Sequence, residues 1–376
     1  MQQAERGVFD MRRGQPVHLS GPDGTMLATA VETMDDDHLR LITELTGSSP
    51  RLVLTGERAC ALGLGTDKDT AVSITLSTGV TTSEIAALAG APVAALPAGL
   101  LRQHTTAAHT AEYGALEMAK AALLVPAVLC ADVPRQPGEA LRKRFEDGTF
   151  LCVPVAQATA LNANPRSGVI RISEADVPLE DADHTRFVLF REHNGVLEHV
   201  AILIGEQEAW GDPVPVRIHS ACLTGDLFGS LRCDCGEQLR SSVHSIAAEG
   251  GGVLLYMAQE GRGIGLANKL RAYGIQDQGL DTVDANRMLG FHDDERHYQA
   301  AIAMLEEIGV RRVKLFTNNP EKILALARGG IDVVERRPLH GSINRHNRLY
   351  LDTKARRAGH LLQGLLNRKR DIESSD

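Results

Sequence analysis

Three cysteines lie close together between positions 222 and 235 of this chain: Cys222, Cys233 and Cys235. This spacing constrains the fold, because three thiolates can hold a tetrahedral zinc ion only if the chain turns to bring them together. Three protein ligands leave the fourth zinc position open for water, as in catalytic sites. A closed structural site needs a fourth ligand, and His219 is the candidate for that alternative. The cluster therefore predicts zinc and favours a catalytic site.

The remaining composition is that of a globular protein, with 43% hydrophobic and 23% charged residues. A length of 376 residues allows two domains, each with its own core. The start of the chain lacks the apolar segment of a signal peptide, and no run of about eighteen apolar residues follows. We therefore expect a cytoplasmic protein with no membrane partner, in which thiols stay reduced. Cys60, Cys130 and Cys152 have apolar neighbours and are expected to be buried.

The charge pattern argues against a nucleic-acid partner. The net charge is −8, and no polybasic run occurs in the first half. Binding to nucleic acid through its phosphates needs such positive charge. A small anionic substrate needs only a few local arginines and lysines, which the second half supplies at dispersed positions.

Hydrophobic patterning predicts an α/β protein of two domains. Within residues 1–150, short apolar runs alternate with alanine-rich helical stretches. Residues 151–185 are charged and contain prolines, as is typical of a linker with some strand content. In residues 186–376 strands are predicted at 187–192, 199–205, 213–219, 252–258, 312–316 and 331–335, with helices between the later ones.

A glycine-rich loop, Gln259–Gly265, connects a predicted strand to a predicted helix. Glycines at such a turn let backbone N–H groups approach a phosphate at the start of the helix. A simple tight turn is an equal alternative, and the absence of a Walker sequence excludes a P-loop. Glu260 offers an acceptor for the edge of a base, and Arg262 offers a donor for phosphate.

Two further polar runs are candidates for chemistry. Asp293–Arg296 follows an apolar segment, and its alternative interpretation is the solvated start of a helix. In Thr317–Lys322 a strand ends, Pro320 opens a helix and a lysine occupies the first turn. A lysine there opposes the helix dipole, which favours a phosphate partner.

Together these segments resemble GTP cyclohydrolase II, the zinc enzyme that opens riboflavin biosynthesis. The resemblance covers about residues 186–362 and rests on RIHSACLTGDLFGSLRCDCGEQL, GGVLLYMAQEGRGIGLANKLRAYGIQDQGLDTVDAN, LGFHDDER, LFTNNPEK, VERRPL and YLDTKARRAGHLL. It implies an α/β unit that acts as a homodimer. The implied reaction converts GTP and water into formate, pyrophosphate and 2,5-diamino-6-ribosylamino-4(3H)-pyrimidinone 5′-phosphate.

The resemblance also implies roles for single residues, with the three cysteines as zinc ligands and Mg²⁺ on the triphosphate. The implied GTP contacts are Arg217, Ile218, His219, Ser220, Ala221, Gln238, Glu260, Gly261, Arg262, Thr282, Thr317 and Lys322. Asp294 matches the proton acceptor, Arg296 the nucleophile and Tyr273 a residue that orients water. Because the arginine pKa lies above about 12, stabilisation of transition-state charge is an alternative role for Arg296.

One departure from the family pattern adjoins the first cysteine. Many family members carry a glutamate where this chain has Ala221. The loss of that carboxylate removes a candidate base or ribose acceptor near the zinc, although a backbone contact from position 221 would survive. Two alternatives to the implied activity also stay open. One is a related GTP hydrolase that stops at the formylated intermediate or serves another pathway. The other is a zinc- and nucleotide-binding regulator without turnover.

The first half weakly resembles 3,4-dihydroxy-2-butanone 4-phosphate synthase, which precedes this hydrolase in bifunctional relatives. The similar runs are TGVTTSEIAALA and AAHTAEYGALEMA. The acidic magnesium loop of the synthase has no counterpart, and Thr106 and Ala131 stand where it carries an arginine and an acidic residue. Asp35–Asp37 is expected to be a solvated turn, with a metal site as the alternative. We therefore expect an inactive domain kept for folding, dimerisation or regulation.

Overall fold

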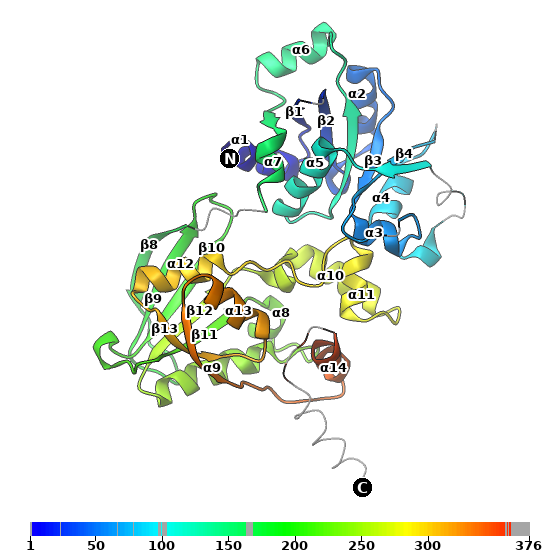
Figure 1. Ribbon diagram of the computed structural model, residues 1–376. Helices are drawn as coiled ribbons and strands as arrows, with labels where there is room; N and C mark the ends of the chain where they lie inside the picture. The colour runs from blue at the N-terminus through cyan, green and yellow to red at the C-terminus, as the bar shows by residue number, and fades with distance from the viewer. Residues whose placement is uncertain are drawn as a thin grey trace. The chain divides into compact units, whose positions relative to one another are not determined.

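A computed structural model describes residues 2–361 except 23, 66, 78, 97–98, 100–103, 163–167, 358 and 360. The chain forms two compact units, each built on a seven-stranded sheet with helices (Figure 1). The first unit comprises Met1–Pro165, Ala267–Leu280 and Asp284–Glu295, and the second comprises Arg166–Leu266, Asp281–Val283 and Arg296–Asp376. The predicted two-part α/β class is confirmed. The end of the predicted second domain, residues 362–376, lies outside the described residues.

The sheet of the first unit has the order β5-β4-β3-β6-β2-β1-β7, in which β1 and β7 are parallel and the other pairs antiparallel. Its strands are β1 (Val17–Gly21), β2 (Gly24–Ala30), β3 (Arg51–Leu54), β4 (Val72–Thr75), β5 (His104–Ala107), β6 (Ala127–Asp132) and β7 (Cys152–Pro154). Its helices are α1 (Gln2–Arg12), α2 (Asp36–Thr46), α3 (Gly56–Ala61), α4 (Thr82–Gly90), α5 (Thr110–Ala121), α6 (Glu139–Glu146) and α7 (Val155–Thr159), with short turns η1 (Val31–Thr33) and η2 (Val93–Ala95).

The alternation of side chains explains why helices cover both faces of this sheet. In β3, Val53 packs into a core with residues of α1, α5 and α7. Its neighbours Leu52 and Leu54 face the other way, into a core with residues of α3 and α4. Successive strand residues point to opposite faces, so a strand that is apolar at every position needs cover on both sides.

The environment of the cysteines and of the acidic run Asp35–Asp37 in the first half differs in part from the prediction. Cys130 is buried as predicted, but the prediction was wrong for Cys152, which is exposed. Cys152 lies on the edge strand β7, where alternation turns its neighbour Val153 into the core instead. The acidic run Asp35–Asp37 begins α2, and Asp35 caps the helix by accepting a hydrogen bond from the His38 amide at 2.9 Å.

The sheet of the second unit has the order β14-β13-β11-β12-β10-β9-β8. The pairs from β14 to β12 are parallel, and those from β12 to β8 are antiparallel. Its strands are β8 (Val169–Asp176), β9 (Thr185–Glu192), β10 (Glu198–Ile204), β11 (Val214–Ser220), β12 (Gly252–Met257), β13 (Arg312–Phe316) and β14 (Asp332–Arg337). The strands predicted from residue 186 onward are confirmed.

The helices of the second half include two that cross the boundary between the units, α10 and α11. They are α8 (Leu223–Asp226), α9 (Cys235–Ala248), α10 (Gly265–Gln276), α11 (Thr282–Met288), α12 (Gln299–Ile308), α13 (Pro320–Arg328) and α14 (Arg348–Arg356), with turns η4 (Gln207–Ala209) and η5 (Glu260–Gly263). Within the described part of the chain, no helix has the length and apolar character needed to cross a membrane.

Strand β11 shows how this sheet positions polar side chains. Val216 and Ile218 pack into the core formed with α12 and α13. Alternation turns Arg217 and His219 to the opposite face, which α9 covers with a second core around Ile246. Strands β11, β12 and β13 are parallel, so their carboxyl ends meet at one edge of the sheet. Ligand sites of α/β sheets form at such edges.

Candidate functional site

The predicted site residues of the second unit follow the carboxyl ends of three neighbouring strands. Cys222 comes two residues after β11, Glu260 three residues after β12, and Thr317 directly after β13. The cysteine pair at the start of α9 lies on the face to which Arg217 and His219 point, since Arg217 donates a hydrogen bond to Gln238 of α9 at 2.7 Å. One sheet edge thus gathers segments that are far apart in sequence.

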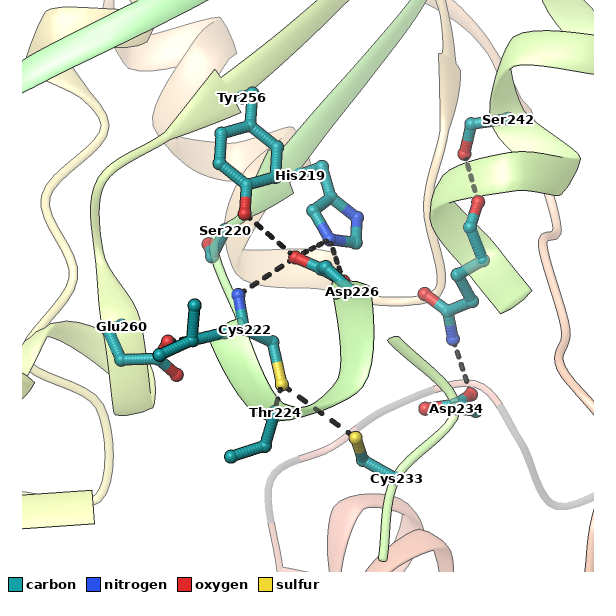
Figure 2. Close-up of polar contacts among 12 residues, drawn as sticks. His219, Ser220, Cys222, Thr224, Asp226, Cys233, Asp234, Ser242, Tyr256 and Glu260 are labelled. Carbon is teal, nitrogen blue, oxygen red and sulfur yellow. Dashed lines mark hydrogen bonds and ion pairs between the residues drawn. The ribbon is translucent and has the colours of Figure 1, made fainter. Parts of the chain in front are cut away.

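The three cysteines form one cluster. Their Sγ atoms all lie within 4.8 Å of one another, and those of Cys222 and Cys233 are 3.7 Å apart (Figure 2). The hydrogen bond with Cys222 raises the pKa of Cys233, and hydrogen bonds with both other thiols, together with burial, raise the pKa of Cys235. Three thiolates this close would repel one another, so a divalent cation is needed to keep all three ionised. The donor set therefore fits a thiophilic metal.

Two glycines allow the thiols to approach. A Cβ atom on Gly225 of α8 would lie 2.7 Å from the Cys233 Sγ and 3.1 Å from the Cys222 Sγ. A Cβ on Gly236 of α9 would lie 2.2 Å from the Gly225 carbonyl oxygen. Helices α8 and α9 therefore pack with backbone against backbone, which a side chain at either position would prevent. Neither glycine was singled out from the sequence, although both lie within the cysteine segment.

A buried carboxylate, Asp226, fixes the first cysteine (Figure 2). It accepts hydrogen bonds from the Cys222 amide at 2.9 Å and from the Tyr256 hydroxyl at 3.0 Å. The His219 Nε2 lies 3.1 Å from the same carboxylate, and the rings of His219 and Tyr256 stack at 5.7 Å. His219 thus pairs with a carboxylate, and the group of described residues that could hold a metal comprises the three cysteines.

Burial favours the neutral form of His219. Loss of solvent lowers the pKa of His219 and outweighs the opposite effect of Asp226. The imidazole is therefore neutral at pH 7, and its buried Nδ1 has no hydrogen-bond partner in the protein. An unpaired buried nitrogen at a predicted substrate contact suits a ligand that offers it a hydrogen bond.

A second buried carboxylate, Asp234, supports the start of α9. It lies between Cys233 and Cys235, and its Oδ1 is 3.4 Å from the Lys354 Nζ of α14. Burial raises the pKa of Asp234, but Lys354 and a hydrogen bond from Gln238 lower it overall. Asp226, Asp234, Tyr256 and Lys354 were all missed by the sequence reasoning. The available signal for the two aspartates was their place in the cysteine segment, Asp234 between two cysteines and Asp226 four residues after Cys222.

Two buried cations lie behind the strand ends. The guanidinium of Arg217 donates to the Phe316 carbonyl at 2.8 Å, and the Lys322 Nζ donates to the Ile218 carbonyl at 2.8 Å. Burial lowers the pKa of Arg217 to about 10, so it remains protonated at neutral pH. Lys322 lies in the first turn of α13, where the helix dipole is also positive. Together these groups favour an anion at this edge.

The loop after β12 takes the form of a short turn, η5. Gly261 and Arg262 both have φ of 65°, a left-handed conformation that is uncommon for arginine. Glu260 accepts a hydrogen bond from the Leu223 amide at 2.6 Å and one from the Gly261 amide at 3.2 Å. The glutamate therefore bridges the glycine loop to α8, the helix that follows Cys222.

Ser220 and Ala221 at the end of β11 and Thr317 after β13 complete this part of the site. The Ala221 amide donates to the Met257 carbonyl at 2.8 Å, so it continues the pairing of β11 with β12. The Ser220 hydroxyl accepts a hydrogen bond from the Arg296 guanidinium at 3.4 Å. Thr317 is buried, and its hydroxyl accepts a hydrogen bond from the Asn319 amide at 3.0 Å. Arg296 therefore lies at the strand edge, beside the residues before Cys222.

The remaining predicted residues lie where the chain passes, in sequence, from one unit to the other. Thr282 begins α11 and belongs to the second unit. Tyr273 of α10 and the exposed Asp294 belong to the first unit. Asp293–Arg296 does not begin a helix, because α12 starts at Gln299. The helix predicted at Pro320 is confirmed.

Comparisons with known proteins cover nearly the whole chain. The profile of the GTP cyclohydrolase II family matches residues 170–338. A GTP cyclohydrolase-2 of Azospirillum brasilense is 43% identical over 96% of this chain and 94% of its own length. The riboflavin biosynthesis protein RibBA of Phocaeicola vulgatus is 40% identical over 72% of this chain and 67% of its own. A solved two-domain 3,4-dihydroxy-2-butanone 4-phosphate synthase from A. baumannii covers 90% of this chain and 99% of its own, with 15% identity and a TM-score of 0.32. That likeness is too low to define a fold.

Replacing Gly225, which packs against the thiols, tests the geometry of the cysteine cluster. Gly225→Ala should lower bound zinc to well below one ion per chain, because the added methyl group would occupy the space between Cys222 and Cys233. Metal analysis after equilibration with zinc and removal of the excess measures this. Gly138→Ala is the matched control, since a Cβ there meets no atom within 4 Å. Full zinc content in Gly225→Ala would contradict the packing described.

Proposed function

The chain belongs to the GTP cyclohydrolase II family, and on that premise we propose that it hydrolyses GTP to 2,5-diamino-6-ribosylamino-4(3H)-pyrimidinone 5′-phosphate, formate and pyrophosphate, the first step of riboflavin biosynthesis. One observation carries the proposal. Three thiols that fit a metal meet at the sheet edge where the buried cations Arg217 and Lys322 favour an anion. A site for water activation and a site for phosphates are thereby brought to the same strand ends.

Cys222, Cys233 and Cys235 would hold one zinc ion. When bound, zinc would act as a Lewis acid that makes water nucleophilic near neutral pH, as hydrolysis at C8 of guanine requires. The protein contributes the placement of the ligands, through the Asp226 hydrogen bond to the Cys222 amide and the close packing of α8 and α9. The neutral His219 would offer its Nδ1 to the substrate.

Glu260 would select guanine. Its carboxylate accepts two amide hydrogen bonds next to the cysteine cluster, so it is held where an acceptor can meet the guanine N1–H and exocyclic amine. Adenine lacks this pair of donors and would leave a carboxylate unpaired, which costs much affinity. Gly261 and Arg262 would contact the nucleotide from the same turn.

The triphosphate would lie against the positive groups at this edge. Arg217, Arg262 and Lys322 would bind its oxygens, with Mg²⁺ on the departing pyrophosphate. The other GTP contacts that we propose are Ile218, Ser220, Ala221, Gln238, Thr282 and Thr317.

We further propose that the enzyme is a cytoplasmic homodimer. Residues 186–376 would form the cyclohydrolase domain, after a linker at residues 151–185. Residues 1–150 would form an inactive synthase-like domain.

Arg296 would act at the phosphate end of the reaction. Its hydrogen bond to Ser220 holds the guanidinium beside β11, where it can meet the α-phosphorus either as a nucleophile or as a stabiliser of developing charge. Asp294, two residues earlier, would accept the proton in the first case. Tyr273 would orient a water molecule during release of formate.

Product stoichiometry tests the proposed reaction. With GTP, zinc and Mg²⁺, the purified protein should release formate, pyrophosphate and the pyrimidine in equal amounts, because both ring opening and deformylation are assigned to this site. Enzymatic formate and pyrophosphate assays with chromatography of the pyrimidine measure the three products together. Cys233→Ser should bind no zinc and yield no formate.

Other product patterns would contradict the proposal in distinct ways. Consumption of GTP without matching formate would indicate that the enzyme stops at the formylated intermediate, the first alternative to the implied activity. GTP binding without pyrophosphate release would indicate a regulator. Unchanged formate output from Cys233→Ser would refute the metal assignment.

A variant of the arginine separates its two proposed roles. Arg296→Ala should abolish turnover if the side chain is the nucleophile, and a phosphoramidate adduct should then be trapped on the wild-type protein and detected by mass spectrometry. An electrostatic role predicts residual turnover, reduced by about two to three orders of magnitude, and no adduct. Wild-type rates in Arg296→Ala would exclude both roles.

A further inference from the structure

An arginine that the proposed function does not use is fully buried in the first unit. Arg58 of α3 is 0% exposed, and its guanidinium donates four hydrogen bonds to backbone carbonyls. Its Nε donates to Leu88 at 2.8 Å, and its Nη2 donates to Ala87 at 3.0 Å and to Ala91 at 2.7 Å. Its Nη1 donates to Met288 at 2.7 Å, in a segment that comes from the second half of the sequence.

The four carbonyls belong to two helix ends. Helix α4 ends at Gly90 and α11 ends at Met288, and the carbonyl end of each helix carries partial negative charge. A planar guanidinium with five donors can serve both ends at once. Burial lowers the pKa of Arg58 to about 10, so it keeps its charge at neutral pH. Arg58 thus joins the end of α11 to α3 and α4 within the first unit.

The neighbours of Arg58 continue this attachment along the chain. The Thr55 hydroxyl donates to the Gly290 carbonyl at 2.8 Å. Gly290 has φ of +85°, and a Cβ there would lie 2.8 Å from that hydroxyl oxygen, so only glycine fits this close passage. Glu57 is buried, and its carboxylate lies 3.4 Å from the His292 Nδ1 and 3.6 Å from the Arg287 Nε.

The segment held in this way leads directly into the proposed catalytic residues. Arg287 forms a two-point ion pair with Asp293, at 3.1 Å for each contact. The His292 amide donates to Glu295 at 2.8 Å. Asp293 and Glu295 are therefore engaged within the segment, while Asp294 between them is exposed.

We propose that Arg58, together with Thr55 and Glu57, is a positioning residue for the cyclohydrolase reaction. Thr55, Glu57 and Arg58 hold the segment 287–295, which belongs to the same unit, and so set the position of Asp294. The proposal rests on the proposed function of Asp294.

Kinetics of the zinc-loaded full-length enzyme test the proposal. Arg58→Met should lower kcat about tenfold or more, because small misplacements of catalytic groups are costly. The KM for GTP should change by less than about threefold, since the proposed binding residues on β11, β12 and α13 are untouched. Zinc content should stay at the wild-type level. Arg58→Lys should recover part of kcat, because an ammonium group keeps the charge but cannot reach all four carbonyls.

A matched control distinguishes positioning from general destabilisation. Arg51 of the same unit pairs with Glu112 at 2.8 Å and with Asp132 at 2.7 Å, and neither partner belongs to the segment 287–295. Arg51→Met should therefore leave kcat unchanged. If Arg58→Met does not fold, Thr55→Val and Glu57→Gln replace it, each removing one attachment. Equal losses of kcat in the Arg58 and Arg51 variants, or an effect on KM alone, would overturn the proposal.

Hydrogen exchange separates this proposal from the proposed function. The amides of Leu289, Gly290 and Phe291 donate hydrogen bonds to carbonyls of residues 285–287, so they should exchange slowly in the free enzyme. Arg58→Met should accelerate exchange at these amides, and Arg51→Met should not. Unchanged exchange in Arg58→Met would overturn the attachment whatever the enzyme catalyses. Absence of formate from the wild-type protein would instead overturn the proposed function.

Discussion

The buried carboxylate of Asp226 is the interaction on which the rest of the site depends. It joins the Cys222 amide at the start of α8 to Tyr256 on β12 and to His219 on β11. Without it, these buried polar groups would lose their partner at a cost of about 1–3 kcal/mol each. Because the same carboxylate contacts a proposed metal ligand and a predicted substrate contact, it fixes their positions relative to each other.

The charged groups around Asp226 suit both a metal ion and an anion. The pKa values of the Cys233 and Cys235 thiols are raised, so the protein alone does not keep these two groups ionised. The buried Arg217 and Lys322 each donate a hydrogen bond to a backbone carbonyl, which leaves their positive charge in place. A metal would complete the first group and phosphates the second. A metal ion would supply the positive charge that stabilises the thiolates. The phosphates of a nucleotide would supply the negative charge that the two buried cations favour.

Much of this could be predicted from sequence, because the strands of the second half are strongly apolar and the cysteines are close together. The sequence did not reveal the features that depend on tertiary packing. Gly225 and Gly236 matter only because α8 and α9 meet backbone to backbone. Lys354 reaches Asp234 across 120 positions of sequence. Arg58 resembles any helical arginine until its four carbonyl partners are seen. Such contacts leave no periodic pattern.

X-ray absorption at the zinc edge counts the ligands of the metal in the working enzyme. An open zinc centre should show three sulfur atoms at about 2.3 Å and one lighter ligand in the free enzyme, and the lighter ligand should change when GTP is added. Cys233→Ser should remove the signal. Four sulfur ligands, or a coordination shell that GTP leaves unaltered, would contradict an open zinc centre that acts on the nucleotide.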